Sequence, residues 1–145
     1  MERTAEGLGK MEVWKLVLLT FFTGGIYSAV WFLRRLGAIN GLSSPVKLNQ
    51  GVFGFIIAGC ASNIGMALFL VLFSGRIGPQ TSANLSTASD ILSLLVEVTV
   101  LLQTFKVRKV FMDHFMEKEK REISFSWAGT FFFSIFYLQY KINRL

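Results

Sequence analysis

The sequence predicts an all-α, polytopic integral membrane protein with a single membrane domain over residues 1–145. Of its 145 residues 52% are hydrophobic, and they occur in long blocks separated by short charged stretches. Such blocks are typical of helices that have lipid as their solvent, whereas a soluble domain keeps many positions polar to cover its surface. The 15 phenylalanines also favour lipid-facing helices over a compact water-soluble core.

Four apolar segments define two to four predicted transmembrane helices, at residues 13–33, 51–73, 91–105 and 123–140. The second is the safest span, because it carries no charge over more than the roughly 20 residues needed to cross a bilayer. The third has about 15 apolar residues, roughly 22 Å of helix, so it crosses only if the basic residues after it extend along the membrane edge. Those residues are Lys106, Arg108 and Lys109. Apolar residues then recur at helical spacing, which predicts a charged cytoplasmic helical extension over residues 106–122.

The distribution of lysine and arginine separates two topologies, because basic residues are retained on the cytoplasmic side of a membrane. If all four segments cross, the two sides carry nine and six basic residues, which is a weak bias. If the first and last segments re-enter, one side carries 14 basic residues and the other carries Arg76 alone. The re-entrant arrangement therefore gives the cleaner asymmetry and places both termini in the cytoplasm.

Gly24 and Gly25 form a predicted break in the first segment, because a glycine inside a helix costs about 1 kcal/mol relative to alanine. The last segment has Ser134 at the matching place and no glycine pair, so it is open between spanning and re-entering. The two segments share the pattern T-F-F-x4-Y, which begins at Thr20 and again at Thr130. Either they are equivalent elements that flank a central pair, or the likeness arises by chance in a Phe-rich chain. Aromatic residues near the segment ends are predicted interfacial anchors: Trp14, Trp31, Trp127 and Tyr140.

Glu97 is the most informative polar position, because a carboxylate at membrane depth is costly and indicates a function by default. Two interpretations stay open. Glu97 could relay protons or cations along the third segment, or it could be a neutral carboxyl hydrogen-bonded to Asn63 or Ser62 of the second segment. A single acid without a second acid, histidine or arginine makes a poor relay.

Small residues recur on adjoining faces of the second segment, where they let helix backbones approach closely. The predicted packing residues are Gly54, Ala58, Ala61, Ser62 and Gly65. They could pack inside the monomer or between copies, so the expected partners are the lipid bilayer and either further copies or a larger membrane complex.

Several classes of function are not indicated. The chain carries no catalytic motif, so no enzymatic activity, cofactor or metal site is predicted. Its histidine and its cysteine, His114 and Cys60, lie in different contexts, and His114 is expected at the interfacial surface. The net charge of +6 does not indicate nucleic-acid binding, because the basic residues lie at the ends of apolar segments.

Two stretches of the chain resemble a known family. Thr20–Arg35 reads TFFTGGIYSAVWFLRR and resembles the opening signature of the domain of unknown function family forty-two thirty-four, a group of small bacterial membrane proteins. Phe136–Asn143, with the sequence FYLQYKIN, is similar to that family's closing segment. The resemblance implies a multi-pass protein of the bacterial inner (cytoplasmic) membrane, and it brings no established activity or catalytic residues.

Two hypotheses for function follow. The first is a non-enzymatic subunit that assembles with itself or serves as an accessory scaffold, and whose aromatic segments lodge in one leaflet and can shape the membrane. The alternative is a small proton- or cation-conducting module that uses Glu97.

Overall fold

The computed structural model describes residues 8–73, 75–118 and 124–144, and all regular secondary structure in these residues is helical. The predicted all-α class is therefore confirmed. The elements are α2 (Val13–Phe22), α3 (Ile26–Gly41), α4 (Gln50–Phe73), α5 (Pro79–Met112), the π-helical turn η1 (Asp113–Lys118) and α6 (Trp127–Ile142).

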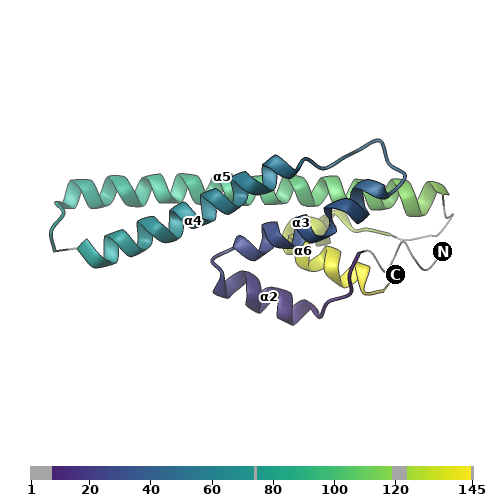
Figure 1. The fold of residues 1–145 in the computed structure, drawn as a ribbon, viewed down its shortest axis with the longest axis horizontal. Helices are drawn as coiled ribbons and strands as arrows, with labels where there is room; N and C mark the ends of the chain where they lie inside the picture. Colours follow the sequence, from purple (N-terminus) through teal and green to yellow (C-terminus); the bar gives the residue numbers. More distant parts are fainter. Residues whose placement is uncertain (1–7, 74, 119–123, 145) are drawn as a thin grey trace.

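Helices α4 and α5 form a long antiparallel pair, α3 and α6 pack against one end of it, and α2 packs on α3 and α6 (Figure 1). At 1.5 Å per residue, the 24 residues of α4 span about 36 Å and the 34 residues of α5 about 51 Å. Both helices are long and apolar enough to cross a membrane. The described residues before α2 and the end of α6 lie towards the end of the pair opposite the α4–α5 turn, and we call this end the terminal end (Figure 1).

Two helices extend beyond their predicted bounds. Helix α5 begins at Pro79, whereas the apolar pattern places the third segment at residues 91–105. Proline suits the first helical position, because its fixed φ is helical and the N–H that it lacks has no helical partner there. The polar residues that follow are mostly exposed, so they form helix without needing a buried face. Helix α3 likewise continues through Arg34 and Arg35 to Gly41, which shortens the basic connection to residues 42–49.

The predicted extension after the third segment is helical as far as the structure describes it. Helix α5 continues to Met112 and η1 to Lys118, and residues 119–122 lie outside the described part. His114 in η1 is buried, so its expected surface position is wrong. Its Nδ1 accepts a hydrogen bond from the Ser43 N–H at 3.2 Å, and Ser44 Oγ donates to Asp113 at 2.6 Å. These bonds hold η1 against the 42–49 connection and enclose the imidazole.

The first apolar segment is a helical hairpin, with the break at the predicted glycines. Gly24 and Gly25 have φ values of 55° and 89°, which L side chains rarely adopt. The Gly25 N–H donates to the Thr20 carbonyl at 2.8 Å, and the Tyr27 N–H donates to Thr23 Oγ1 at 3.0 Å. The turn points along the α4–α5 pair and stops well short of its far turn (Figure 1).

The last apolar segment is also broken, at Ser134, where φ is 44° and ψ is −125°. A Cβ added at Gly129 would lie 2.8 Å from the Tyr137 ring, and Tyr137 OH accepts a hydrogen bond from the Ser126 N–H at 2.8 Å. In a continuous helix residues 129 and 137 would be about 12 Å apart along the axis, so α6 doubles back on itself. The two copies of the T-F-F-x4-Y pattern thus both contain a chain break at the matching place.

The apolar core lies towards the terminal end. There the Phe32 and Phe53 rings stack with centroids 5.0 Å apart, which joins α3 to α4. Trp31 belongs to this core and is fully buried, so its predicted role as an interfacial anchor is wrong. Its indole Nε1 donates to the buried Gln139 at 2.7 Å, a partner on α6 that its own segment could not reveal. The other predicted anchors, Trp14, Trp127 and Tyr140, are exposed.

Candidate functional site

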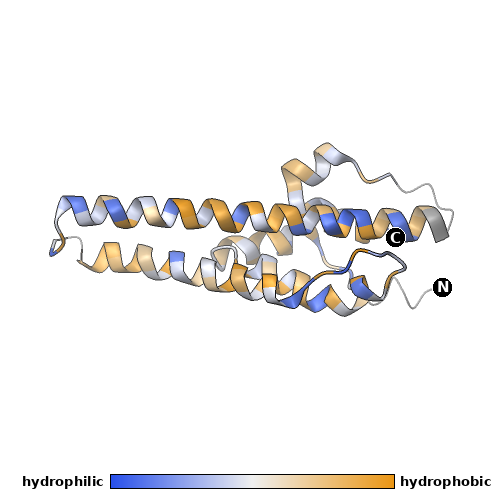
Figure 2. Cartoon of the chain, turned by 90° about the horizontal axis from the view of Figure 1, so that it is seen from above, coloured by the Kyte–Doolittle hydropathy of each residue, from blue (hydrophilic) through white to orange (hydrophobic). Residues whose placement is uncertain are grey.

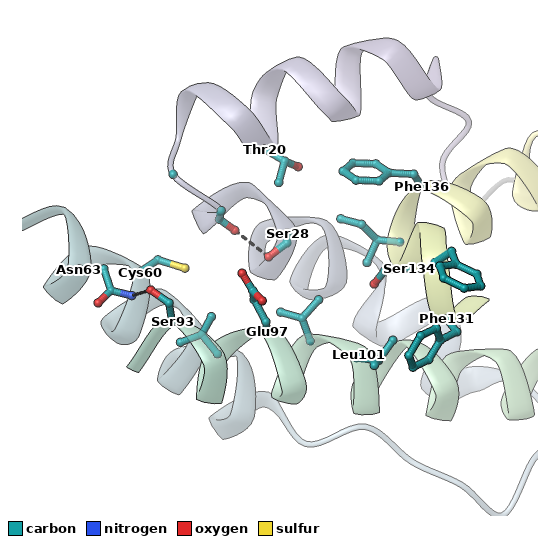
Figure 3. A pocket seen from close by; sticks show the side chains of 16 residues that line it. Thr20, Ser28, Cys60, Asn63, Ser93, Glu97, Leu101, Phe131, Ser134 and Phe136 are labelled. Atoms are coloured by element: carbon teal, nitrogen blue, oxygen red, sulfur yellow. Dashed lines mark hydrogen bonds between the residues drawn. The ribbon is translucent and has the colours of Figure 1, made fainter. Parts of the chain in front are cut away.

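A cavity of about 680 Å³ lies where the α2–α3 turn, α4, α5 and the break in α6 meet. We call it the Glu97 cavity (Figure 3). Its walls combine phenyl rings from α6 with polar side chains from every surrounding element. The polar lining residues are Thr20, Ser28, Asn63, Ser93, Glu97 and Ser134.

The Glu97 side chain projects from α5 into this cavity, towards the α2–α3 turn (Figure 3). Ser28 lies across the space and donates its hydroxyl proton to the Gly25 carbonyl at 2.6 Å. No hydrogen bond or ion pair joins the Glu97 carboxyl to any residue in the described part of the chain. The carboxyl is therefore available to water or to a cation that enters the cavity.

Asn63 does not bind Glu97, so the hydrogen bond that the sequence suggested between them is wrong. Asn63 Nδ2 donates to Ser93 Oγ at 2.9 Å, and Ser89 Oγ donates to Asn63 Oδ1 at 3.1 Å. Both serines lie on α5 within one turn of each other, and they satisfy the donor and the acceptor of the amide together. Asn63 thus joins α4 to α5 through these two hydrogen bonds. Ser62, the other suggested partner, is exposed.

The composition of the cavity limits its chemistry. Apart from the Cys60 thiol, Glu97 is the titratable group among its described lining residues. No second acid, histidine or arginine lines it there, so a proton leaving Glu97 meets only hydroxyl and amide groups. No group of three or more His, Cys, Asp or Glu side chains within residues 8–73, 75–118 and 124–144 is placed to hold a metal ion. The arrangement suits a single bound cation or water better than a relay.

The predicted packing residues of α4 all face outward. The exposed set is Gly54, Ala58, Ala61, Ser62 and Gly65. A Cβ added at Gly54 or Gly65 would meet nothing within 4 Å. These residues therefore do not pack α4 inside the chain, and their predicted contact between copies stays a prediction.

Gly59 makes the close contact inside the chain, and sequence reasoning missed it. A Cβ added there would lie 2.5 Å from Val96 Cγ2 on α5. One signal could have identified it, because Asn63 lies four residues further along the same helix face. A polar residue at membrane depth points towards protein, so that face is the inner one.

Arg35 forms a second polar centre at the terminal end, where α3, α6 and residues 8–11 meet. Its Nη2 donates to the Gly9 carbonyl at 2.7 Å and to Gln139 Oε1 at 2.8 Å. The side chain is buried, and burial lowers the pKa of Arg35 to about 10, so the guanidinium stays protonated at neutral pH. Sequence reasoning missed this centre because a basic residue after an apolar segment is usually exposed.

The chain matches no protein-family model, no curated protein and no solved structure. Its likeness to family forty-two thirty-four therefore stays a prediction. The two stretches that carry this likeness nevertheless meet in the fold, since Trp31 and Arg35 of the first both donate to Gln139 of the second.

Proposed function

We propose that this chain is a non-enzymatic protein of the bacterial inner membrane that shapes the bilayer. It does so by lodging short helices in the cytoplasmic leaflet, and it assembles with further copies or within a larger membrane complex. The observation that carries the proposal is the pair of chain reversals at Gly24–Gly25 and at Ser134, which favours re-entry of the first and last apolar segments over spanning.

The exposure of α4 and α5 supports a lipid environment. Their most apolar windows have mean hydropathies of 2.2 and 1.7, yet only 17% and 6% of the residues in these windows are buried within the chain. A core helix of a soluble protein would be mostly buried, and unpaired apolar surface of this extent is unfavourable in water. Figure 2 shows an apolar middle of α5 between more hydrophilic ends and an α4 that is apolar up to the turn, as expected for helices that cross a bilayer.

The short helices have the dimensions of a one-leaflet insertion, and we call α2, α3 and α6 together the wedge. The ten residues of α2 span about 15 Å, half of the roughly 30 Å hydrocarbon core. The phenylalanines before the two breaks face outward, with Phe21 76%, Phe22 78%, Phe132 73% and Phe133 63% exposed. Because the wedge lies at the terminal end alone, it would widen one leaflet and bend the bilayer (Figure 1).

The charge distribution supports the cytoplasmic placement of the wedge. Arg76 lies at the α4–α5 turn, and in the sequence the other 14 basic residues lie in residues 3–15, 34–47, 106–121 and 141–144, outside that turn. Basic residues are retained on the cytoplasmic side, so the wedge belongs to that leaflet.

The exposed small residues of α4 support assembly, since they let another helix approach closely. A conducting module centred on Glu97 has weaker support, because its cavity lacks a second relay group among the described residues.

Reconstitution into liposomes tests the proposal. The full chain is expected to convert large vesicles of phosphatidylethanolamine and phosphatidylglycerol into tubules or smaller vesicles, as seen by electron microscopy. In the double variant Phe21→Ser, Phe22→Ser this deformation should be largely lost. Each replaced ring removes about 2 kcal/mol of apolar transfer energy, so the hairpin inserts less deeply.

The matched control is Leu68→Ser, Leu72→Ser, which removes two exposed apolar side chains from α4 outside the wedge. It should keep the deformation. Unchanged vesicle shape with the wild-type chain fully incorporated would contradict the proposal. Equal deformation by wild type and by the phenylalanine variant would contradict the role of the wedge.

A further inference from the structure

A second cavity, of about 310 Å³, lies at the terminal end between residues 8–11 and α3. Its lining includes three basic side chains, Lys10, Arg34 and Arg35, together with the Tyr27 phenol. No acidic side chain is among its described lining residues. We call it the basic cavity.

Arg35 carries a buried charge that no anion in the described part of the chain neutralises. Its hydrogen-bond acceptors are the Gly9 carbonyl, the Gln139 amide oxygen and the Trp31 carbonyl at 3.3 Å, all of them uncharged. Its Nε is enclosed and has no hydrogen-bond partner among the described residues. A buried charge without an opposite charge is costly, so this site favours an anion close by.

The nearest acid along the described chain does not serve this purpose. Glu12 lies just after the residues that line the cavity, but its carboxylate pairs with Lys15 at 2.6 Å and both side chains are exposed. An external anion therefore fits the charge of the basic cavity better than a residue from this stretch.

The other polar groups of the cavity suit a phosphate. Lys10 and Arg34 are exposed and free to reach a ligand, and the Arg34 guanidinium lies 6.0 Å from the Tyr27 ring centroid, which helps to orient it. Among the described residues the one hydrogen-bond partner of the Tyr27 hydroxyl is Met11 Sδ, at 4.0 Å, and a thioether is a weak acceptor. Guanidinium, ammonium and phenol groups together provide the charge-assisted hydrogen bonds that recognise phosphate oxygens.

We propose that the basic cavity binds a phosphate group, which Lys10 and Arg34 contact directly and Arg35 attracts from the floor of the cavity. The phosphate could belong to the headgroup of an anionic lipid or to a free phosphate. The inference rests on the cavity alone and does not depend on whether the wedge bends membranes.

Binding measured on the full chain in detergent tests this, by native mass spectrometry for phosphatidylglycerol and by calorimetry for inorganic phosphate. Lys10→Gln, Arg34→Gln should lower the affinity at least tenfold, at about 1 kcal/mol for each basic residue near a lipid headgroup. Lys106→Gln, Lys109→Gln removes the same charge from exposed positions on α5 and should leave the affinity unchanged. If the double variant misfolds, Lys10→Gln alone, at an exposed side chain, should still weaken binding about fivefold.

The two probes distinguish the sources. Binding of phosphatidylglycerol without binding of inorganic phosphate assigns the site to a lipid headgroup, and variant-sensitive binding of inorganic phosphate assigns it to the free ion. The proposal is overturned if neither probe binds, or if the test and control variants weaken binding equally. It is also overturned if a phosphate-free glycolipid binds as tightly as phosphatidylglycerol.

Discussion

Replacing Gly59 with leucine is expected to disrupt the α4–α5 pair. The new Cβ would lie 2.5 Å from Val96 Cγ2, closer than packed carbon atoms approach. Val96 is 6% exposed and β-branched, so its side chain cannot easily rotate away. Overpacking costs about 1–3 kcal/mol, and the three further carbons of leucine place this variant at the upper end. The gain of about 1 kcal/mol in helix propensity offsets only part of that. Thermal unfolding in detergent, followed by circular dichroism, measures the loss.

The neighbouring variant Ala58→Leu is the matched control. Ala58 is exposed on the outer face of α4, so leucine there should leave the unfolding temperature unchanged. The proposed contact between copies should weaken instead, and light scattering should report a smaller assembly. Equal unfolding temperatures for Gly59→Leu and wild type would show that α4 and α5 do not pack as described. An unchanged assembly in Ala58→Leu would remove the outer face of α4 from the proposed interface.

Replacing Gln139 with leucine should destabilise the terminal end by about 3 kcal/mol. Gln139 is fully buried, and its Oε1 accepts from Trp31 Nε1 at 2.7 Å and from Arg35 Nη2 at 2.8 Å. Leucine has a similar volume but no acceptor, so it leaves an indole N–H and a buried guanidinium without this partner. Its loss also removes the hydrogen bond that Gln139 Nε2 donates to Asn143 at 2.8 Å. Asn143 in turn holds Met11 through two hydrogen bonds, so residues 8–11 should loosen as well.

Two measurements check this prediction. The unfolding temperature should fall, and limited proteolysis near Met11 should accelerate. Gln80→Leu makes the same change at an exposed position at the start of α5 and should alter neither. A Gln139→Leu protein as stable as wild type would mean that the buried network around Arg35 contributes little to the fold.

Much of the fold could be predicted from patterns within single segments. Helix α4 follows its uncharged apolar run almost residue for residue, because that run alone decides where the helix starts and ends. The break at Gly24–Gly25 is visible because glycine is the residue that a positive φ requires. The break at Ser134 has no such signal, and only its match to the first copy of T-F-F-x4-Y indicates it.

The features that could not be predicted depend on contacts between segments. Tryptophan is typical of the membrane interface, which is why the sequence predicts Trp31 there. Its indole N–H finds its acceptor, Gln139, on α6, so burial of the ring is favourable. The small residues of α4 recur at four-residue spacing on two faces of the helix. The position of α5 decides that Gly59, and not Ala58, makes the close helix contact. The polar start of α5 lacks the apolar periodicity of a buried helix, which is why its residues suggest a loop.

Topology mapping tests the central claim most directly. Single cysteines at Glu12, Lys47, Gly75 and Arg144, in a Cys60→Ser background, are labelled with a membrane-impermeant maleimide in intact and in opened cells. The proposed wedge requires that Gly75→Cys reacts in intact cells and that the other three react only after the cytoplasm is opened. Termini that label on the same side as Gly75, opposite Lys47, would mean that all four segments span the membrane, and the one-leaflet wedge would be wrong.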